Sequence, residues 1–221
     1  MSKIYLIRHG ESEMNAMQNS LKPQEKVILG RCNWSPLSQK GVEEARNVGR
    51  YLNRQGIVFD HIACSPAVRT QQTASHALEQ LLDHDTLYRV LNSIQLSESL
   101  LERCWGAWDF QLKNERHIVD YQNLLEHNPS VFWDYLPPSG ESNADVAERV
   151  RSFIEEYMLS YENSAVFTHR GCICALLVDA FRLNPKDILN LWMGPGSVSI
   201  LTYEHNQWQN YKAEVFTPNN A

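Results

Sequence analysis

Short runs of apolar residues alternate along the chain with longer segments in which apolar residues recur every three or four positions. The runs at 4–7, 60–64 and 164–168 are rich in residues that favour β-structure, and they predict short buried strands. The longer segments have the spacing of amphipathic helices. The predicted helices are 38–55, 65–81, 112–127, 142–157, 172–181 and 184–191.

The order of these elements predicts an α/β fold. A strand at 4–7, a helix at 38–55 and a strand at 60–64 form a βαβ unit, in which the two strands run parallel. Residues 197–216 predict a β-hairpin at the end of the chain.

Two segments do not follow this regular order. Residues 11–36 have no sustained period and predict a long irregular loop, which in a compact domain is usually functional or mobile. Residues 86–141 predict a mostly helical excursion that covers one end of the sheet. We therefore expect one domain over 1–221, with a lid-like insertion at about 86–141.

The composition narrows the class of protein. The chain has 221 residues, 43% of them apolar, and a net charge of −6, which argues against general nucleic-acid binding because that requires a basic face. The five cysteines include no C-x-x-C pair, so we expect neither a disulfide framework nor a zinc ribbon. No segment reaches the length of a membrane span, and the first apolar run is too short for a signal peptide. We expect a cytoplasmic protein.

Histidine, arginine and glycine follow two of the predicted strands. Arg8-His9-Gly10 comes directly after the first strand, and His169-Arg170-Gly171 comes directly after the strand at 164–168. If these strands are neighbours, the polar side chains converge on one pocket at the carboxyl edge of the sheet. Arginine matches phosphate or carboxylate, and histidine transfers protons or attacks as a nucleophile. The alternative is that these are solvated polar residues at strand ends.

Two further side chains are candidates for the same pocket. Ser65-Pro66 has the residue types of a helix cap and a first helical residue, which places Arg69 in the first turn, where free N–H groups attract anions. Glu102 lies among leucines and tryptophans, and a carboxyl group desolvated in this way suits a general acid. The alternatives are a solvated arginine on the helix and a surface glutamate beside core tryptophans.

Together these residues indicate phosphoryl transfer through histidine. Two guanidinium groups can hold the oxygens of a phosphoryl group, a neutral imidazole can attack phosphorus, and a carboxylic acid can protonate the leaving oxygen. The sequence contains no Walker loop, no carboxylate cluster for Mg²⁺ and no H-E-x-x-H motif. We therefore expect no metal and no cofactor.

The segment Leu6-Ile7-Arg8-His9-Gly10-Glu11-Ser12 resembles the signature of the histidine phosphatase superfamily, the phosphoglycerate mutase-like proteins. The resemblance implies a three-layer α/β/α sandwich with a mostly parallel central sheet and a helical insertion near the active site. It extends along most of the chain. The other matching segments are Pro36-Leu37, Ser65-Pro66 with Arg69, Leu101-Glu102 with Gly106 and Trp108, Gly140-Glu141-Ser142 and Thr168-His169.

The resemblance also implies roles for individual residues. His9 is the nucleophile that becomes phosphohistidine, and Glu102 donates a proton to the leaving group and then acts as the base for water. His169 completes the catalytic set and, with Arg8 and Arg69, binds the phosphoryl oxygens. Asn15 matches a further phosphate-binding residue of the pocket.

Several positions depart from the pattern of the family. Leu29 stands where many members have glutamine, Trp34 where an acidic residue often occurs, and Arg170 where glycine usually follows the second histidine. The segment between Asn15 and Gly30 is also longer than is typical. These loops border the pocket, so the departures concern substrate specificity. Arg170 either binds a second anionic group of the substrate or pairs with a surface acid.

The insertion favours a phosphatase over a mutase. A mutase must hold a second acidic group, but here the insertion offers only Lys113, Arg116 and His117, with no adjacent pair of arginines. It is rich instead in aromatic residues, which are either the core of the lid or contacts to an apolar leaving group. These are Trp105, Trp108, Phe110, Phe132, Trp133 and Tyr135.

We therefore predict a phosphomonoesterase that acts on a small phosphorylated substrate, as a monomer or homodimer. The alternatives are a phosphoglycerate mutase-type enzyme and a non-catalytic protein that binds phosphate for regulation.

Overall fold

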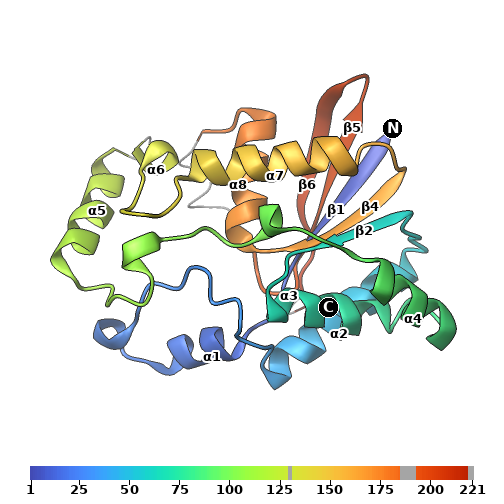
Figure 1. Ribbon diagram of the computed structural model, residues 1–221, viewed down its shortest axis with the longest axis horizontal. Helices are drawn as coiled ribbons and strands as arrows, with labels where there is room; N and C mark the ends of the chain where they lie inside the picture. The colour runs from blue at the N-terminus through green and yellow to red at the C-terminus, as the bar shows by residue number, and fades with distance from the viewer. Residues whose placement is uncertain (129–130, 185–192, 219–221) are drawn as a thin grey trace.

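The computed structural model describes residues 1–128, 131–184 and 193–218. Within them a sheet with strand order β3-β2-β4-β1-β5-β6 forms the centre of the molecule (Figure 1). Strands β1 to β4 are parallel, whereas β5 and β6 run antiparallel to their neighbours, which confirms the mostly parallel sheet and the terminal hairpin. The strands are β1 (Ser2–Arg8), β2 (His61–Cys64), β3 (Gln95–Leu96), β4 (Asn163–Thr168), β5 (Val198–Glu204) and β6 (Gln207–Phe216).

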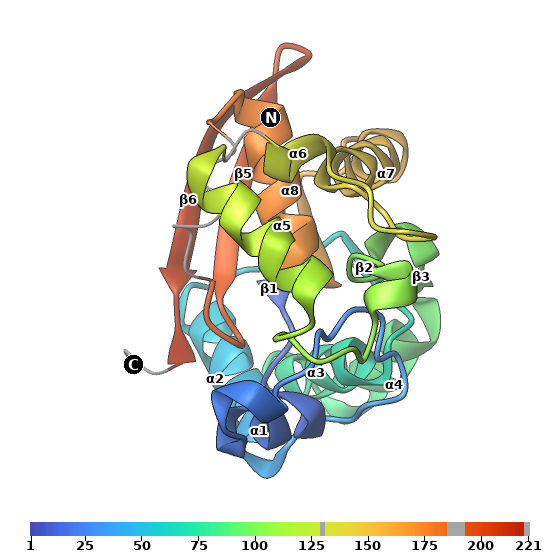
Figure 2. The ribbon, with the colours of Figure 1, turned by 90° about the vertical axis from the view of Figure 1, so that its left-hand side faces the viewer.

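Helices cover both faces of the sheet (Figure 2), as expected for a three-layer α/β/α sandwich. Along β1, Ile4 and Leu6 join the hydrophobic cluster that includes α7 and α8, while Tyr5 and Ile7 join the one that includes α2 and α3. A strand buried on both faces explains why β1 is a continuous apolar run. These helices are α2 (Gln39–Arg54), α3 (Val68–Leu78), α7 (Asn143–Tyr157) and α8 (Arg170–Phe181).

The segment 86–141 contributes to two parts of the molecule. Helix α4 (His84–Ser93) packs Leu87, Val90 and Leu91 against the cluster of α2 and α3, and β3 extends the sheet at its edge. The part that includes α5 (Arg116–His127) builds a separate small cluster, whereas Trp133 of α6 (Val131–Asp134) packs against the cluster of α7 and α8. The buried members of the small cluster are Ile28, Trp108, Ile118 and Tyr121, with Trp105 and Tyr135 packed against them.

The prediction of an irregular segment over 11–36 was wrong for its first part. Helix α1 (Glu13–Ser20) lies there, followed by a 3₁₀ turn at Pro23–Glu25. Ser12 caps α1, because its Oγ accepts the N–H of Asn15 at 3.2 Å while Asn15 Oδ1 accepts the N–H of Ser12 at 3.3 Å. The helix is mostly polar, so the apolar period that predicts other helices is missing here.

The predicted cap of α3 was also wrong. The helix begins at Val68 with Ala67 as its N-cap, two residues later than Ser65-Pro66 predicted. Ser65 does not cap the helix because its hydroxyl contacts a buried histidine, as described below. The helices predicted over 38–55 and 142–157 are confirmed, with Ser38 and Ser142 as their N-caps. The short helix expected over 184–191 falls largely outside the described residues.

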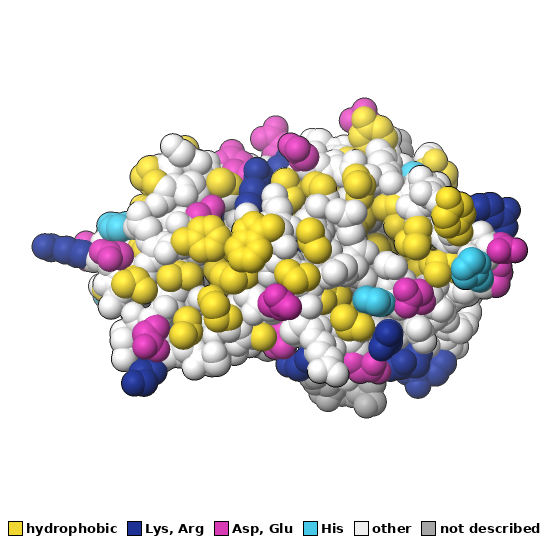
Figure 3. All heavy atoms as spheres, turned by 60° about the horizontal axis from the view of Figure 1, so that its bottom comes forward, with side chains coloured by type: hydrophobic (Ala, Val, Ile, Leu, Met, Phe, Trp, Pro, Cys, Tyr) yellow, Lys and Arg dark blue, Asp and Glu magenta, His cyan; other side chains and the backbone are white. Residues whose placement is uncertain are grey.

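The described helices include none with the length and apolar character needed to cross a membrane. The face that carries α1 to α4 displays acidic and basic side chains interspersed with hydrophobic ones (Figure 3).

Candidate active site

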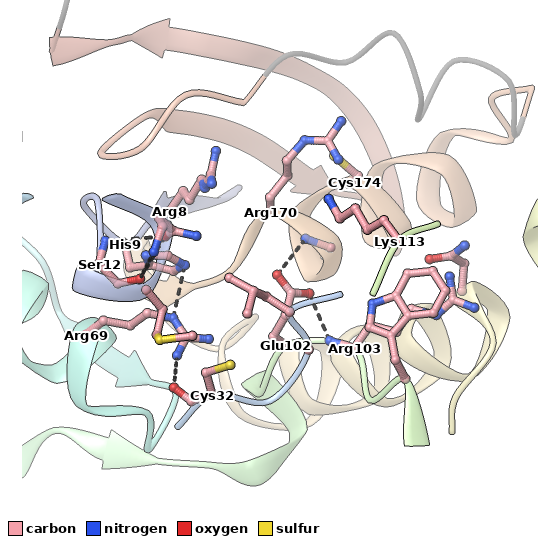
Figure 4. A pocket seen from close by; sticks show the side chains of 17 residues that line it. Arg8, His9, Ser12, Cys32, Arg69, Glu102, Arg103, Lys113, Arg170 and Cys174 are labelled. Atoms are coloured by element: carbon pink, nitrogen blue, oxygen red, sulfur yellow. Dashed lines mark hydrogen bonds between the residues drawn. The ribbon is translucent and has the colours of Figure 1, made fainter. Parts of the chain in front are cut away.

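A cavity of about 410 Å³ lies at the carboxyl ends of β1 and β4 (Figure 4). Six of the seven residues predicted from sequence line it, and the seventh, His169, is fully buried and contacts Arg69. The six are Arg8, His9, Asn15, Arg69, Glu102 and Arg170. The structure therefore brings together side chains from five separate segments of the chain.

The pairing of β1 with β4 places the two histidines next to each other. Arg8 lies opposite Thr168 in the parallel register, and the N–H of His9 donates to the carbonyl of Thr168 at 3.0 Å. The ring centroids of His9 and His169 are 5.1 Å apart. A Cβ at Gly10 would lie 2.4 Å from the carbonyl oxygen of Gly41, so only glycine allows this turn to pack against the start of α2.

Arg69 contacts both histidines. Its Nε donates to His9 Nε2 at 3.2 Å (Figure 4). Its Nη2 donates to His169 Nδ1 at 3.1 Å. A guanidinium group only donates hydrogen bonds, so both of these ring nitrogens must be unprotonated. The other nitrogens carry the protons: Nδ1 of His9 donates to the carbonyl of Gly10 at 2.7 Å, and Nε2 of His169 donates to Ser65 Oγ at 2.9 Å.

The electrostatic environment keeps both histidines neutral. Burial, and secondarily the positive charge of Arg69, lowers the pKa of His9 and of His169 well below the ordinary value of 6.5. A neutral imidazole is the form that can attack an electrophile, and for His9 the lone pair is on Nε2.

Arg8 and Arg69 supply positive charge beside this nitrogen. Burial lowers the pKa of Arg8 to about 10, so the group remains a cation at neutral pH. Among the described residues, the buried Nε of Arg8 has no hydrogen-bond partner. A buried donor without a partner is unfavourable, and an anionic ligand in the cavity would supply an acceptor.

Glu102 lies across the cavity at the first turn of α8. Its Oε1 accepts the N–H of Arg103 at 2.8 Å, and its Oε2 accepts the N–H of Gly171 at 3.4 Å. A Cβ at position 171 would lie 2.1 Å from Glu102 Oε1. Gly171 therefore allows the carboxylate to approach the helix this closely.

A network around Glu141 holds the backbone of Glu102. Arg31 donates to Glu141 at 2.8 Å and to the carbonyl of Glu102 at 3.1 Å. Arg149 donates to Glu141 at 3.0 Å and contacts the same carbonyl at 3.5 Å. Glu141 also accepts the N–H of Cys104 at 2.9 Å. The loop at 31, the segment at 102–104 and α7 are thus joined at one partly buried carboxylate.

Sequence reasoning missed several residues of the site. Ser65, whose Oγ contacts Nε2 of His169, was interpreted only as a helix cap. Arg31 and Arg149 gave no signal, because no local pattern distinguishes them from surface arginines. Lys113 and Trp105 were noted only as members of the insertion, and both line the cavity.

The described residues contain no group of three or more histidine, cysteine, aspartate or glutamate side chains arranged to hold a metal ion. The positive charges positioned to meet an anion next to His9 are the guanidinium groups of Arg8 and Arg69. The arrangement can bind a tetrahedral anion, present a neutral nucleophilic nitrogen to it, and place a carboxyl group on the far side.

Comparisons with known proteins agree with this geometry. Residues 4–214 match the histidine phosphatase superfamily (branch 1). The chain is 26% identical to a 2,3-bisphosphoglycerate-dependent phosphoglycerate mutase of Chlamydia pneumoniae, over 97% of each protein. It is 28% identical to the adenosylcobalamin/alpha-ribazole phosphatase of Escherichia coli, over 79% of this chain and 77% of the relative.

A solved structure has the same fold. The crystal structure of a putative alpha-ribazole-5′-P phosphatase from Escherichia coli superimposes with a TM-score of 0.71, covering 96% of this chain and 95% of the other at 22% identity. Mutases and phosphatases are thus both among the similar proteins. The chain belongs to the histidine phosphatase superfamily, branch 1.

Proposed function

We propose that this protein is a metal-independent phosphomonoesterase that acts on small phosphorylated substrates through a phosphohistidine intermediate. The observation that carries the proposal is the state of His9. His9 lines the cavity, and its Nε2 is unprotonated and lies 3.2 Å from a guanidinium nitrogen of Arg69. A nucleophile and a cation that binds phosphoryl oxygens are therefore adjacent before any substrate arrives.

In the first step, Nε2 of His9 attacks phosphorus and the bond from phosphorus to the ester oxygen breaks. Glu102, in its protonated form, donates its proton to that oxygen, so the product leaves as a neutral alcohol. Arg8 and Arg69 bind the phosphoryl oxygens, where negative charge is distributed in the transition state. His169 supports this binding by positioning Arg69, whose Nη2 donates to its Nδ1.

In the second step, water attacks the phosphorus of phosphohistidine. Glu102, now a carboxylate, takes a proton from the water, and the bond between phosphorus and Nε2 breaks. Inorganic phosphate leaves, and His9 returns to its neutral state with the proton still on Nδ1. We propose that Asn15, whose side chain lines the cavity beside Ser12, adds a further contact to phosphate.

A phosphoglycerate mutase-type reaction is the second candidate. Relatives with that name align with almost the whole chain, and the positively charged residues Lys113 and Arg170 border the cavity beyond Glu102. In a mutase-type reaction, Arg170 would contact the second acidic group of the substrate. The phosphatase is preferred because the apolar side chains of Leu29 and Trp105 are also part of the wall.

The test is release of phosphate from a panel of phosphomonoesters in the presence of a chelator. The panel contains an aryl phosphate, sugar phosphates, nucleotides and 3-phosphoglycerate. We expect phosphate release by the wild type and a loss of about 10⁴-fold or more in kcat for His9→Ala. His84→Ala is the matched control, because the His84 side chain is 94% exposed and remote from the cavity. Transfer within phosphoglycerate with little free phosphate would favour the mutase, and equal rates for both variants would contradict the role of His9.

A further inference from the structure

A second cavity of about 260 Å³ adjoins the first one. The two cavities share Leu29, Trp105 and Lys113 in their walls, so they lie side by side. The rest of the second cavity is formed mainly by Ile28, Ile118 and Tyr121, which belong to the small hydrophobic cluster of the insertion. The cavity is therefore an apolar extension of a strongly cationic site.

Backbone hydrogen bonds hold the walls of this extension in place. Ile28 exchanges two of them with the insertion, since its N–H donates to Gln111 and its carbonyl accepts from Phe110, both at 2.9 Å. The N–H of Lys113 donates to Lys26 at 2.8 Å. The segment before Leu29 and the segment before Lys113 thus form a short antiparallel ladder, and the apolar wall exists without a ligand.

The indole ring of Trp105 is fixed on several sides. The guanidinium group of Arg103 lies 4.1 Å from its ring centroid, and the ring of Tyr121 meets it edge-on at 6.1 Å. Trp108 stacks parallel to it at a centroid distance of 6.2 Å. A rigid aromatic wall binds a flat or extended apolar group with little loss of side-chain entropy.

The position of Glu102 shows which part of a substrate would reach the extension. Figure 4 places Glu102 between the cluster of His9 and Arg69 on one side and Lys113 on the other. In the proposed reaction, the ester oxygen leaves toward Glu102, so the alcohol portion of the substrate lies beyond it. Lys113 borders both cavities, and its methylene stem can contact an apolar group while its ammonium faces the polar ester.

We propose that the extension is the binding site for the alcohol portion of the substrate, and that the preferred substrates are phosphate monoesters of alcohols with an aromatic ring or an alkyl chain. This inference rests on the proposed function. The volume of the second cavity is sufficient for such a group. A cavity of about 150 Å³ lined by apolar side chains is enough to bind benzene, and the second cavity measures about 260 Å³. Leu29 is the specificity-determining residue, because it borders both cavities.

The experiment uses two matched series of ligands, from ethyl through butyl to hexyl. The alkyl phosphates are substrates, and kcat/KM is measured for each of them. Their leaving alcohols have nearly the same basicity, so the members of the series differ only in chain length. Alkyl phosphonates have a carbon–phosphorus bond that this reaction does not break, and they report Kd by calorimetry. We expect both kcat/KM and affinity to rise about three- to fourfold for each methylene that enters the cavity.

Leu29→Gln should remove most of this dependence on chain length, measured as the ratio of hexyl to ethyl values within each protein. Leu29→Met should retain it. Leu124→Gln is the matched control, since Leu124 is 42% exposed on α5 and does not line either cavity. Thermal unfolding of each variant shows whether the protein remains folded.

The outcomes separate the two proposals. If the protein hydrolyses alkyl phosphates at rates independent of chain length, or if Leu29→Gln leaves a dependence intact, the extension is not the alcohol site, although the phosphatase activity stands. If no ester is hydrolysed but phosphonates bind more tightly as the chain lengthens, the binding site stands and the proposed reaction is wrong. If phosphonate affinity does not change with chain length, the inference is overturned regardless of activity.

Discussion

The two ends of the cavity are built in different ways. The end that holds His9, Arg69 and His169 is formed where parallel strands finish and helices begin, and its polar groups are fixed by hydrogen bonds inside the main core. The end that holds Leu29 and Trp105 is formed by two loop segments that pair with each other outside that core. We infer that the first end determines the reaction and the second determines the substrate.

This difference predicts which substitutions affect every substrate and which affect only some. Changes at the strand ends should reduce the rate for all phosphate esters. Changes in the apolar extension should alter the ranking of esters but leave the chemistry intact. The predictions below test this division.

The largest effect that depends on the leaving group is expected for Glu102→Gln. The amide cannot donate a proton to the departing oxygen as an acid does, so kcat for an alkyl phosphate should fall by about 10²- to 10⁴-fold. For 4-nitrophenyl phosphate, whose leaving group needs little protonation, the loss should be much smaller. Steady-state kinetics with both esters give the comparison. Equal losses for the two esters would mean that Glu102 is not the acid.

Arg69→Lys should reduce kcat/KM by about 10²- to 10³-fold for every ester, because lysine cannot reproduce the fork that contacts both histidines. The affinity for vanadate, which binds as a phosphate-like anion, should fall as well. Arg50→Lys is the matched control, since the Arg50 side chain is 43% exposed on α2. A loss confined to long-chain esters would contradict the division between the two ends.

Gly171→Ala should lower kcat by about 10- to 100-fold with little change in the free energy of unfolding. The added Cβ would lie 2.1 Å from Glu102 Oε1, so the carboxyl group must move, whereas alanine itself favours the helix. In the background of Glu102→Asp, whose side chain is one methylene shorter, the same change should have a smaller effect. Steady-state kinetics measure kcat, and urea unfolding measures the free energy of unfolding. Both are applied to the wild type, the two single variants and the double variant. Additive losses in the double variant would show that the two residues do not interact.

The smallest expected effect is a dependence of the free energy of unfolding on pH. Below about pH 6.5 an unfolded chain binds protons on its histidines, but native His9 and His169 do not, because their pKa values are well below 6.5. Lowering the pH therefore reduces the free energy of unfolding, by about 2 kcal/mol for this pair between pH 6.5 and 5.5. Urea unfolding of wild type and of His9→Asn with His169→Asn should show a shallower decline in the double variant. Identical declines would mean that the histidines are not held neutral.

The end of the cavity that determines the reaction could largely be predicted from the sequence. His9 and His169 each follow an apolar run directly, so a local pattern reveals both the strand and the residue at its end. Arg69 was placed correctly in the first turn of its helix, although the helix starts at Val68. The start was mispredicted because Ser65 contacts His169, a partner 104 residues away.

The apolar end could not be predicted. It depends on the contact between the segments around Ile28 and Gln111, which are far apart in the chain and have no hydrophobic period. Of the two alternatives for the aromatic residues of the insertion, the core of the lid applies to Trp108, which is 4% exposed. Phe110, in contrast, is 47% exposed. The side chain of Phe132 lies outside the described residues.

The central claim is that Nε2 of His9 forms a covalent bond to phosphorus. The most direct measurement is rapid quenching of the enzyme with a ³²P-labelled alkyl phosphate, followed by peptide mapping under alkaline conditions, in which phosphohistidine survives. The account predicts label on the peptide that contains His9, appearing before free phosphate reaches its steady rate, and no label in His9→Ala. Steady release of phosphate with no labelled enzyme at any time, or label retained in His9→Ala, would contradict it.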